Sequence, residues 1–440
     1  MDNLATEILI VGGGPAGMAA AVAASESGKR ITIVDDNPKL GGQIWRAEMG
    51  KIKSPVASKL LDAINETRIE IANNATVFAA PKPQTLAADT PAGPIHIEYE
   101  KLIIATGARE RFLPFPGWTL PNVVGAAGLQ ALVKGGLDVR DKRIVVAGTG
   151  PLLLAVAEYL KSKGAEIAAI AEQIPGKKLR RFALKLITSP SKISEAVEMK
   201  SKLGGVPYLT ECWVTKCGSP RVTQGLTSEL RDPPSLKRGF RPKSGPPQRK
   251  LEVSLTRKTK TWTVECDYLA CGFHLVPNLE LISLLGCDIQ QGFVGVDEFQ
   301  RTSCENVFCA GEPTGIGAVE ASIIEGTIAG YAVAGDETAA RKYFGKREKT
   351  RRFAAALDTA FSLRDELKLL ADEDTIVCRC EDVTYGRLKD FVSSHSAKLQ
   401  TRCGMGSCQG RVCGAATEFL FGWKPGSVRP PIFPVRMENL

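Results

Sequence analysis

Glu7-Ile-Leu-Ile-Val11, followed at once by Gly12-Gly13-Gly14-Pro15-Ala16-Gly17, is the stretch of this chain that decides its fold. The apolar run is typical of a buried strand, and it enters a turn made largely of glycine. An alanine-rich pattern from Met18 to Ser27 predicts a helix, and Ile31-Thr-Ile-Val34 predicts a second strand that ends at Asp35. This order is that of a dinucleotide-binding unit, in which the acid accepts hydrogen bonds from a ribose.

The residues of the turn have predicted roles in binding the cofactor. Gly12 permits the tight turn, Gly14 lets the backbone approach a pyrophosphate, and Gly17 lets the helix pack close to the strand. Pro15 and Ala16 belong to the same predicted site, where the N-terminus of the helix faces the phosphates with its partial positive charge.

Three further segments favour FAD as the dinucleotide. Leu40-Gly-Gly-Gln-Ile-Trp45, Leu102-Ile-Ile-Ala-Thr-Gly107 and Val307-Phe-Cys-Ala-Gly-Glu312 resemble elements of the glutathione-reductase-like flavoproteins. In that class the Ala-Thr-Gly turn joins two dinucleotide-binding domains, and the late acid binds the ribityl chain of the flavin. The residues predicted to contact FAD in these segments are Gly42, Gln43, Thr106, Gly107, Gly311 and Glu312.

A second unit of the same kind begins at Arg143, and it is altered. Gly148 and Gly150 repeat the glycine turn and Glu172 ends the following strand, but the third glycine position holds Leu153. We expect the leucine to hold the helix off the strand and to disturb the seat of a pyrophosphate. The pattern therefore disfavours NAD(P)H and favours a vestigial or mononucleotide-binding site.

Five cysteines near the end of the chain have the spacing of a metal centre. Their positions predict a four-cysteine iron–sulphur or zinc site, since glycines between them let the backbone wrap a cluster. Spacing alone leaves the second pair open, because the third and fourth cysteines are as far apart as the fourth and fifth. A site containing histidine is hard to build from the three histidines of the chain. The five cysteines are Cys378, Cys380, Cys403, Cys408 and Cys413.

Composition narrows the class of protein. The chain has 440 residues and a formal net charge of +9, and its first residues contain no secretory signal. No apolar run is long enough for a transmembrane helix, so we expect a cytoplasmic protein whose cysteines are free or bind metal. Basic residues gather between 219 and 250 without interleaved aromatic residues, which predicts a solvated loop or a docking surface rather than a nucleic-acid site.

The cysteine-rich segments carry a family resemblance. Val377 to Thr384 and Thr401 to Cys413 look like a [2Fe–2S] domain of the bacterioferritin-associated-ferredoxin type, in the variant found in the A subunit of opine (octopine or nopaline) oxidases. The B subunit of hydrogen cyanide synthase shares this architecture with the FAD/[2Fe–2S] subunit of hydroxyproline dehydrogenases. The resemblance implies that Cys403 is a free thiol beside the cluster. It implies four iron ligands, which are Cys378, Cys380, Cys408 and Cys413.

What the resemblance implies about function is electron transfer within a heteromeric complex. In such complexes the partner is an FAD protein similar to D-amino-acid oxidases, and it oxidises the C–N bond of an opine such as nopaline or octopine. This chain would relay the electrons to a downstream acceptor, with a second flavin, FMN, at the boundary between the two proteins. The presence of a small third subunit stays open, as does peripheral association with the inner membrane through the acceptor. We assign no catalytic residues, and the alternative is a self-contained NAD(P)H-dependent flavoprotein reductase.

The predicted architecture is α/β, with an FAD-binding domain that is split by a second Rossmann-like domain and followed by a small iron–sulphur domain. The FAD-binding domain comprises residues 1–118 and 291–345, and the second Rossmann-like domain comprises 119–290 with the basic loop 219–250 inside it. The remaining segments are a linker over 346–372, the [2Fe–2S] domain over 373–425 and a C-terminal tail over 426–440.

Overall fold

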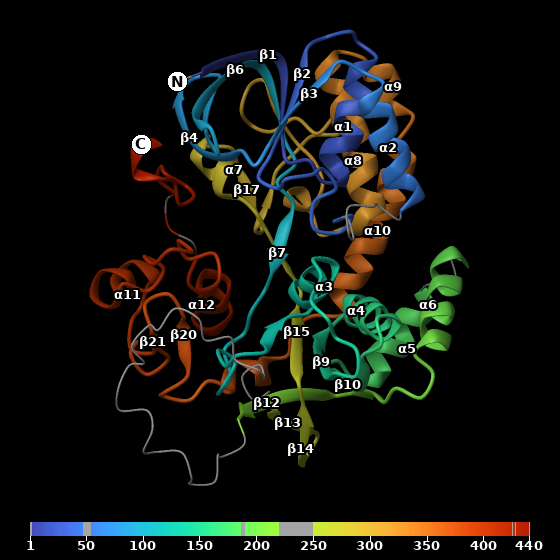
Figure 1. Ribbon diagram of the computed structural model, residues 1–440, viewed down its shortest axis with the longest axis vertical. Coiled ribbons are helices and arrows are strands. Elements are labelled where there is room, and N and C mark those ends of the chain that lie inside the picture. The colour runs from blue at the N-terminus through green and yellow to red at the C-terminus, as the bar shows by residue number, and fades with distance from the viewer. Residues whose placement is uncertain are drawn as a thin grey trace, which may run out of the picture.

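The computed structural model describes residues 2–46, 54–185, 190–219, 250–424, 426 and 428–439, so all but the ends of the basic loop lies outside the described residues. The N-terminal unit is built on a seven-stranded sheet in the order β3-β2-β1-β6-β5-β4, with β19 paired to β6 (Figure 1). β1, β2, β3 and β19 run parallel to their neighbours, whereas β4, β5 and the first half of β6 form an antiparallel meander. The strands are β1 Asp2–Val11, β2 Ile31–Asp35, β3 Ile69–Asn73, β4 Thr76–Lys82, β5 Thr85–Thr90, β6 Gly93–Ile104 and β19 Val307–Cys309.

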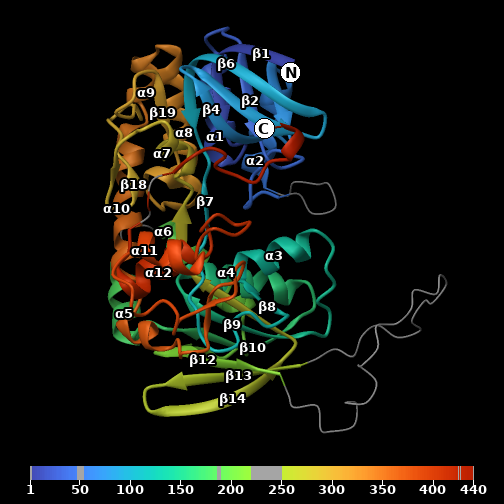
Figure 2. The ribbon, with the colours of Figure 1, turned by 90° about the vertical axis from the view of Figure 1, so that its left-hand side faces the viewer.

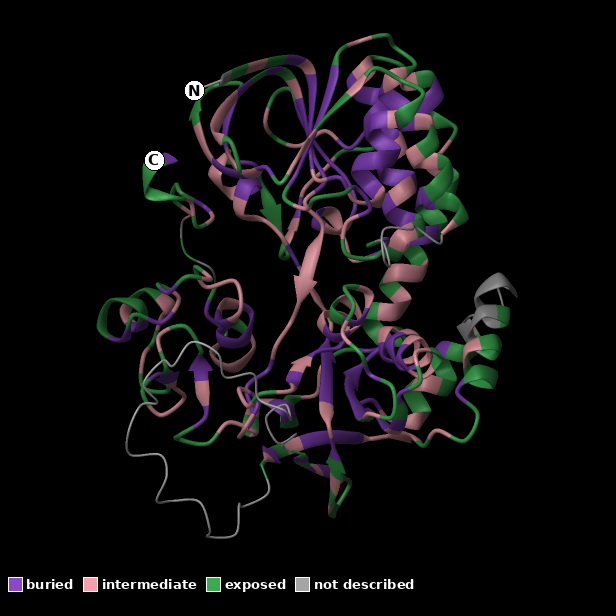
Figure 3. Ribbon diagram, in the orientation of Figure 1, coloured by how far each residue is buried: buried purple, intermediate pink, exposed green. Residues whose placement is uncertain are grey.

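Two buried helices cover one face of this sheet, and their small residues explain how closely they pack. α1 (Pro15–Ser25) is rich in buried alanine, and α8 (Ala318–Ala334) lies against it (Figure 3). A Cβ on Gly326 of α8 would lie 2.1 Å from the carbonyl oxygen of Ala16, so only glycine fits there. α2 (Pro55–Asn65) and α9 (Glu337–Arg341) complete this layer.

The second unit has a five-stranded parallel sheet in the order β11-β10-β9-β15-β8. Its strands are β8 Val123–Gly125, β9 Arg143–Thr149, β10 Glu166–Glu172, β11 Tyr208–Thr210 and β15 Tyr268–Phe273. Its helices are α3 Ala126–Lys134, α4 Pro151–Ser162, α5 Gly176–Lys185 and α6 Pro190–Lys202. A three-stranded antiparallel sheet flanks it, made of β12 Cys212–Gly218, β13 Leu251–Arg257 and β14 Lys260–Cys266.

A two-stranded ribbon links the two units. β7 (Ala108–Glu110) leaves the first unit and β16 (Leu275–Pro277) returns to it, and the two pair antiparallel between the upper and lower halves of Figure 1. After the return come α7 (Glu280–Leu284) and the short ribbon of β17 (Ile289–Gln290) and β18 (Phe293–Val294). The two units, each with its own dinucleotide turn, are therefore connected by this paired ribbon.

The segment expected as a linker is largely helical. α10 (Phe344–Ala360) runs from the first unit down to the second, where it contacts α5 (Figure 2). A small C-terminal domain follows, with β20 (Ile376–Cys378), β21 (Val383–Thr384), α11 (Ser394–Thr401) and α12 (Cys413–Phe421). The tail then returns to the first unit, where the N–H of Ile432 donates to the carbonyl of Phe78.

Candidate functional site

The first glycine turn offers an open cradle at the N-terminus of α1. A Cβ on Gly17 would lie 1.8 Å from the carbonyl oxygen of Gly12, which is why the helix can start so close to β1. Gly14 is the residue that precedes α1, and a Cβ there would meet no protein atom closer than 3.9 Å, the Cα of Gly42. The free N–H groups of the first helical turn face this space, so the cradle fits a pyrophosphate.

Asp35 ends β2 beside the cradle and is almost completely buried. One carboxylate oxygen accepts a hydrogen bond from the N–H of Gly13, and the other accepts from the N–H of Asn37 at 2.8 Å. The acid therefore fixes the glycine turn in place. Its predicted contact with a ribose stays a prediction.

The other segments predicted to contact FAD converge on the same region. Gly42 approaches Gly14 across the cradle, and Gln43 beside it is exposed. Thr106 is held by Asn278 through two hydrogen bonds, one from the Thr106 hydroxyl to the Asn278 carbonyl at 2.9 Å and one from the Asn278 amide to the Thr106 carbonyl at 2.8 Å. The N–H of Asn278 also donates to the carbonyl of Gly107. Asn278 was not predicted, because nothing in its local sequence indicates a partner so distant along the chain.

Gly311 and Glu312 follow β19 and lie under a buried ionic network. Glu325 on α8 accepts hydrogen bonds from the N–H of Gly311 at 3.1 Å and from the hydroxyl of Thr314 at 2.7 Å. Arg351 on α10 pairs with the same carboxylate at 3.1 Å. Burial raises the pKa of Glu312 to about 6.

Replacing Glu325 with alanine should lower the free energy of unfolding by roughly 2–3 kcal/mol, because buried groups that bond to a charged partner would lose it. The buried N–H of Gly311 would be left without its acceptor, and the half-buried Arg351 would keep only its hydrogen bond to Gln300. The control is Glu348→Ala, which breaks only the exposed pair with Arg352 and should cost at most about 0.5 kcal/mol. Urea unfolding of both variants checks the difference, and equal costs would contradict the network.

The second glycine turn differs from the expectation. Leu153 was expected to disturb the seat of a pyrophosphate at this turn. Instead its side chain is completely buried and packs in the core of the second unit. It fits because Gly272 on β15 has no side chain; a Cβ there would lie 3.3 Å from the methyl group of Leu153. The leucine is therefore a core residue, and the first turn of α4 begins directly after Gly150.

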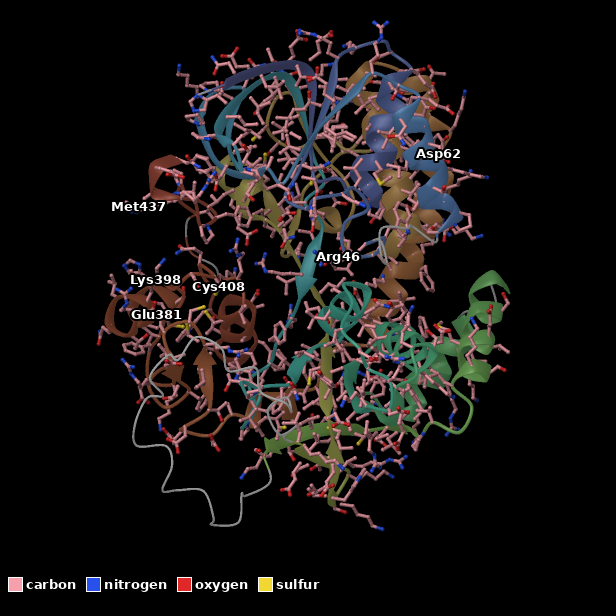
Figure 4. All side chains as sticks on the ribbon, viewed as in Figure 1. Arg46, Asp62, Glu381, Lys398, Cys408 and Met437 are labelled. Atoms are coloured by element: carbon pink, nitrogen blue, oxygen red, sulfur yellow. The ribbon has the colours of Figure 1, made fainter. Side chains whose placement is uncertain are left out.

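The five C-terminal cysteines lie together (Figure 4, near the labelled Cys408). The thiols of Cys378, Cys403 and Cys413 are all within 4.8 Å of one another and buried. The thiol of Cys408 contacts those of Cys413 and Cys380, and Cys380 is exposed. Four thiolates from this group suit either a [2Fe–2S] cluster or zinc, so the donor set fits the predicted metal site.

Local geometry explains why these cysteines meet. Cys378 ends β20, and Cys413 begins α12. Gly406 approaches the turn after β20 so closely that a Cβ on it would lie 2.3 Å from the Cβ of Cys380. Thiol contacts with Cys403 and Cys413 lower the pKa of Cys378, and contacts with the other thiols raise the pKa of Cys413, because the thiols of this group donate hydrogen bonds to one another.

The structure changes the expected position of one cysteine. Cys403 was predicted as a neighbouring thiol packed behind the loop, whereas it lies among the cluster sulphurs between Cys378 and Cys413. The choice of four ligands from five cysteines therefore stays a prediction.

Seven further cysteines lie outside this group; Cys287 is buried, Cys304 is half-buried, and the other five are buried thiols. Cys212, Cys217, Cys266, Cys271 and Cys309 are free and buried, and burial raises the pKa of each thiol.

The cysteine-rich loop is docked onto the first unit. Arg109 of β7 donates to the carbonyl of Arg411 at 3.1 Å and forms an ion pair with Glu280 at 2.8 Å. Burial lowers the pKa of the Arg411 guanidinium, although Glu280 and Asp36 beside it favour its charged form. Through Arg109, this set of contacts joins the loop between Cys408 and Cys413 to β7 and to Glu280 of α7.

A mainly apolar cavity of about 420 Å³ lies between the cysteine cluster and the second unit. Phe112, Trp118 and Leu132 line one side, and Cys380 and Cys408 line the other. The floor is the N-terminus of α3, where Glu110 accepts hydrogen bonds from the N–H groups of Ala127 and Gly128. The wall of the cavity thus includes two cysteines of the C-terminal group, Cys380 and Cys408.

Comparison with known proteins is consistent with this geometry. Residues 6–326 match the family described as pyridine nucleotide-disulphide oxidoreductase. The chain is 30% identical to the HcnB subunit of hydrogen cyanide synthase from Pseudomonas protegens, over 92% of this chain and 89% of that protein. It is 28% identical to the A subunit of opine oxidase from Agrobacterium tumefaciens, over 99% of this chain and 91% of that protein.

A solved structure shares the fold. L-proline dehydrogenase from P. horikoshii superposes with a TM-score of 0.66 at 17% identity, covering 100% of this chain and 80% of that one. These similarities confirm the α/β flavoprotein fold and the resemblance to the A subunit of opine oxidase. Within the described ranges, every helix is too short or too polar to traverse a bilayer.

Proposed function

This chain belongs to the pyridine nucleotide-disulphide oxidoreductase family and is an oxidoreductase, and on that premise we propose that it is the electron-transfer subunit of a heteromeric opine or amino-acid dehydrogenase. The proposed substrate is an opine such as nopaline or octopine, which the complex cleaves oxidatively to an amino acid and a 2-oxo acid. The C–N oxidation takes place on a partner subunit that resembles D-amino-acid oxidases.

The observation that carries the proposal is the docking of the cysteine cluster on the first dinucleotide unit. Arg109 holds the carbonyl of Arg411, and both residues lie near Glu280 at the junction. These contacts hold the proposed metal-binding thiols in a fixed position relative to the unit that carries the dinucleotide cradle. Such an arrangement suits electron relay, and none of the described side chains in it form a set suited to amine oxidation.

The residues of this chain supply binding and positioning for two proposed cofactors. We propose that the cradle of Gly12, Gly14 and Gly17 binds FAD and that four of the five clustered cysteines bind a [2Fe–2S] cluster. When bound, the flavin exchanges electrons in pairs or singly and the cluster exchanges them one at a time. The apolar cavity beside Cys380 and Cys408 is our candidate for the FMN at the boundary with the partner subunit.

The experiment that tests this function uses the complex. The chain is co-expressed with a candidate partner subunit that resembles D-amino-acid oxidases, and opines and amino acids are added without oxygen. We expect the substrate to bleach the flavin and to produce the EPR signal of a reduced cluster, with release of an amino acid and a 2-oxo acid. The isolated chain should show none of these reactions. Opine oxidation by the isolated chain, or reduction of the complex only by NADH or NADPH, would refute the proposal.

A further inference from the structure

The chain passes directly over the second glycine turn as it leaves α10. A Cβ on Gly150 would lie 4.0 Å from Cγ of Phe361, whose side chain is 3% exposed. Gly150 precedes α4, where the free N–H groups of a helix would face a phosphate. The ring of Phe361 therefore covers the place from which a pyrophosphate would approach.

Hydrogen bonds fix the chain in this position. The hydroxyl of Thr149, the middle residue of the turn, donates to the carbonyl of Phe361 at 3.3 Å. The amide of Gln173 donates to the carbonyl of Ser362 at 3.1 Å, and the N–H of Arg364 donates back to Gln173 at 3.1 Å. The strand ends of the second unit thus bind the backbone of this segment.

Apolar contacts hold the same segment from the other side. The rings of Phe361 and Phe182 meet edge to face at 5.3 Å, and Ile174 and Ala360 complete a small buried cluster around them. The guanidinium of Arg364 lies 4.7 Å from the centre of the Trp213 ring. Ala360 and Phe361 are therefore part of the folded core, whereas Ser362 beside them is exposed.

The acid that would bind a ribose in the second unit is held by backbone N–H groups, as Asp35 is in the first unit. Glu172 is fully buried, and its two carboxylate oxygens accept hydrogen bonds from the N–H groups of Gly150 at 2.8 Å and Ile174 at 3.1 Å. In a dinucleotide-binding unit the acid at this position reaches the ribose hydroxyls. Here burial raises the pKa of Glu172 to about 7, and no face of the side chain is open to a ligand.

We propose that residues 358–364 occupy the second dinucleotide site as a built-in substitute for the nucleotide, so that NADH and NADPH cannot bind. The second unit then serves to anchor the connector that leads to the cysteine-rich domain. The proposal deepens the proposed function, since electrons must then enter from the partner subunit. It also replaces Leu153 with Phe361 as the residue that blocks the site.

The test is binding of NADH, NADPH and ADP-ribose to the full-length protein as purified, measured by calorimetry and by anaerobic flavin spectra. Wild-type protein should show no binding at concentrations on the order of 1 mM. The double variant Phe361→Gly/Ser362→Gly should bind ADP-ribose at least about tenfold more tightly than wild type, because the open state becomes populated. Leu153→Gly should still show no binding. Phe344→Ala, which removes a ring from the other end of α10, is the control and should behave as wild type.

Hydrogen exchange on the wild-type protein keeps the proposal testable should the double variant fail to fold. The amide of Arg364 should be protected, and the nucleotides should leave its exchange unchanged. Nucleotide binding by wild type, exchange accelerated by a nucleotide, or a folded double variant that stays unable to bind would each overturn the proposal. Flavin and iron contents are measured in every sample, and their absence would count against the proposed function alone.

Discussion

Replacing Cys413 with serine should abolish the iron–sulphur centre. Its buried thiol contacts the thiols of Cys378, Cys403 and Cys408, so it lies at the centre of the cluster of sulphurs. Loss of a ligand removes binding energy that also stabilises the fold of a small metal domain. We expect less than about a tenth of the wild-type iron content, together with loss of the EPR signal of the reduced cluster. Cys304→Ser, a substitution in the first unit outside the cluster, is the control.

The same measurements decide between Cys403 and the other candidates. The family resemblance pairs Cys408 with Cys413, so Cys408→Ser should lose or shift the signal and Cys403→Ser should leave it nearly unchanged. The position of Cys403 within 4.8 Å of Cys378 and Cys413 makes this a strict test. Loss of iron in Cys403→Ser with a harmless Cys413→Ser would assign Cys403, in place of Cys413, as the fourth ligand. Equimolar zinc without iron, in protein prepared without oxygen, would refute the electron relay itself.

Replacing Gly14 with valine should abolish the flavin spectrum while leaving the protein folded. The backbone of Gly14 has a φ of −76°, which valine adopts, and a Cβ there would meet no protein atom within 3.9 Å. The added side chain would therefore fill only the space that faces the N-terminus of α1. We expect the FAD content of the purified protein to fall at least about tenfold, equivalent to about 1.4 kcal/mol or more of lost binding free energy.

Two other substitutions separate this effect from misfolding. Gly17→Val should destabilise the fold, since even its Cβ would lie 1.8 Å from the carbonyl of Gly12. Gly345→Val is the control, because Gly345 is exposed on α10 and has no neighbour within 4 Å of a Cβ. Circular dichroism and flavin absorbance together give the answer. Stoichiometric FAD in folded Gly14→Val would show that the cradle does not bind the pyrophosphate.

The local motifs were predictable because strands, turns and helix starts depend on interactions between residues that are close together in the sequence. The run from Glu7 to Gly17 specifies a buried strand, a turn and a helix start, and the structure has β1 ending at Val11 and α1 starting at Pro15. The second turn at Gly148 and Gly150 was recognised for the same reason, and β9 and α4 flank it.

The surroundings of those motifs, and therefore what each can bind, depended on contacts with other parts of the chain. Leu153 was expected to disturb the second turn, yet Gly272 on a neighbouring strand gives it room in the core. Asn278 supports the first site through hydrogen bonds to Thr106, which is far away in the chain, and Glu325 through hydrogen bonds to Gly311 and Thr314; neither residue has a local signal. The linker expected over 346–372 gave no indication that Phe361 would cover a nucleotide turn.

Three local features could be recognised from the amino-acid order alone: a dinucleotide turn, a second altered turn and a group of closely spaced cysteines suited to metal binding. Only the tertiary structure decided how these parts are used. It placed Phe361 over Gly150, Cys403 among the other thiols and Arg109 against the cysteine loop. The physical reason is that backbone turns follow from short-range sterics, whereas burial and pairing follow from the path of the whole chain, which brings separated side chains into contact.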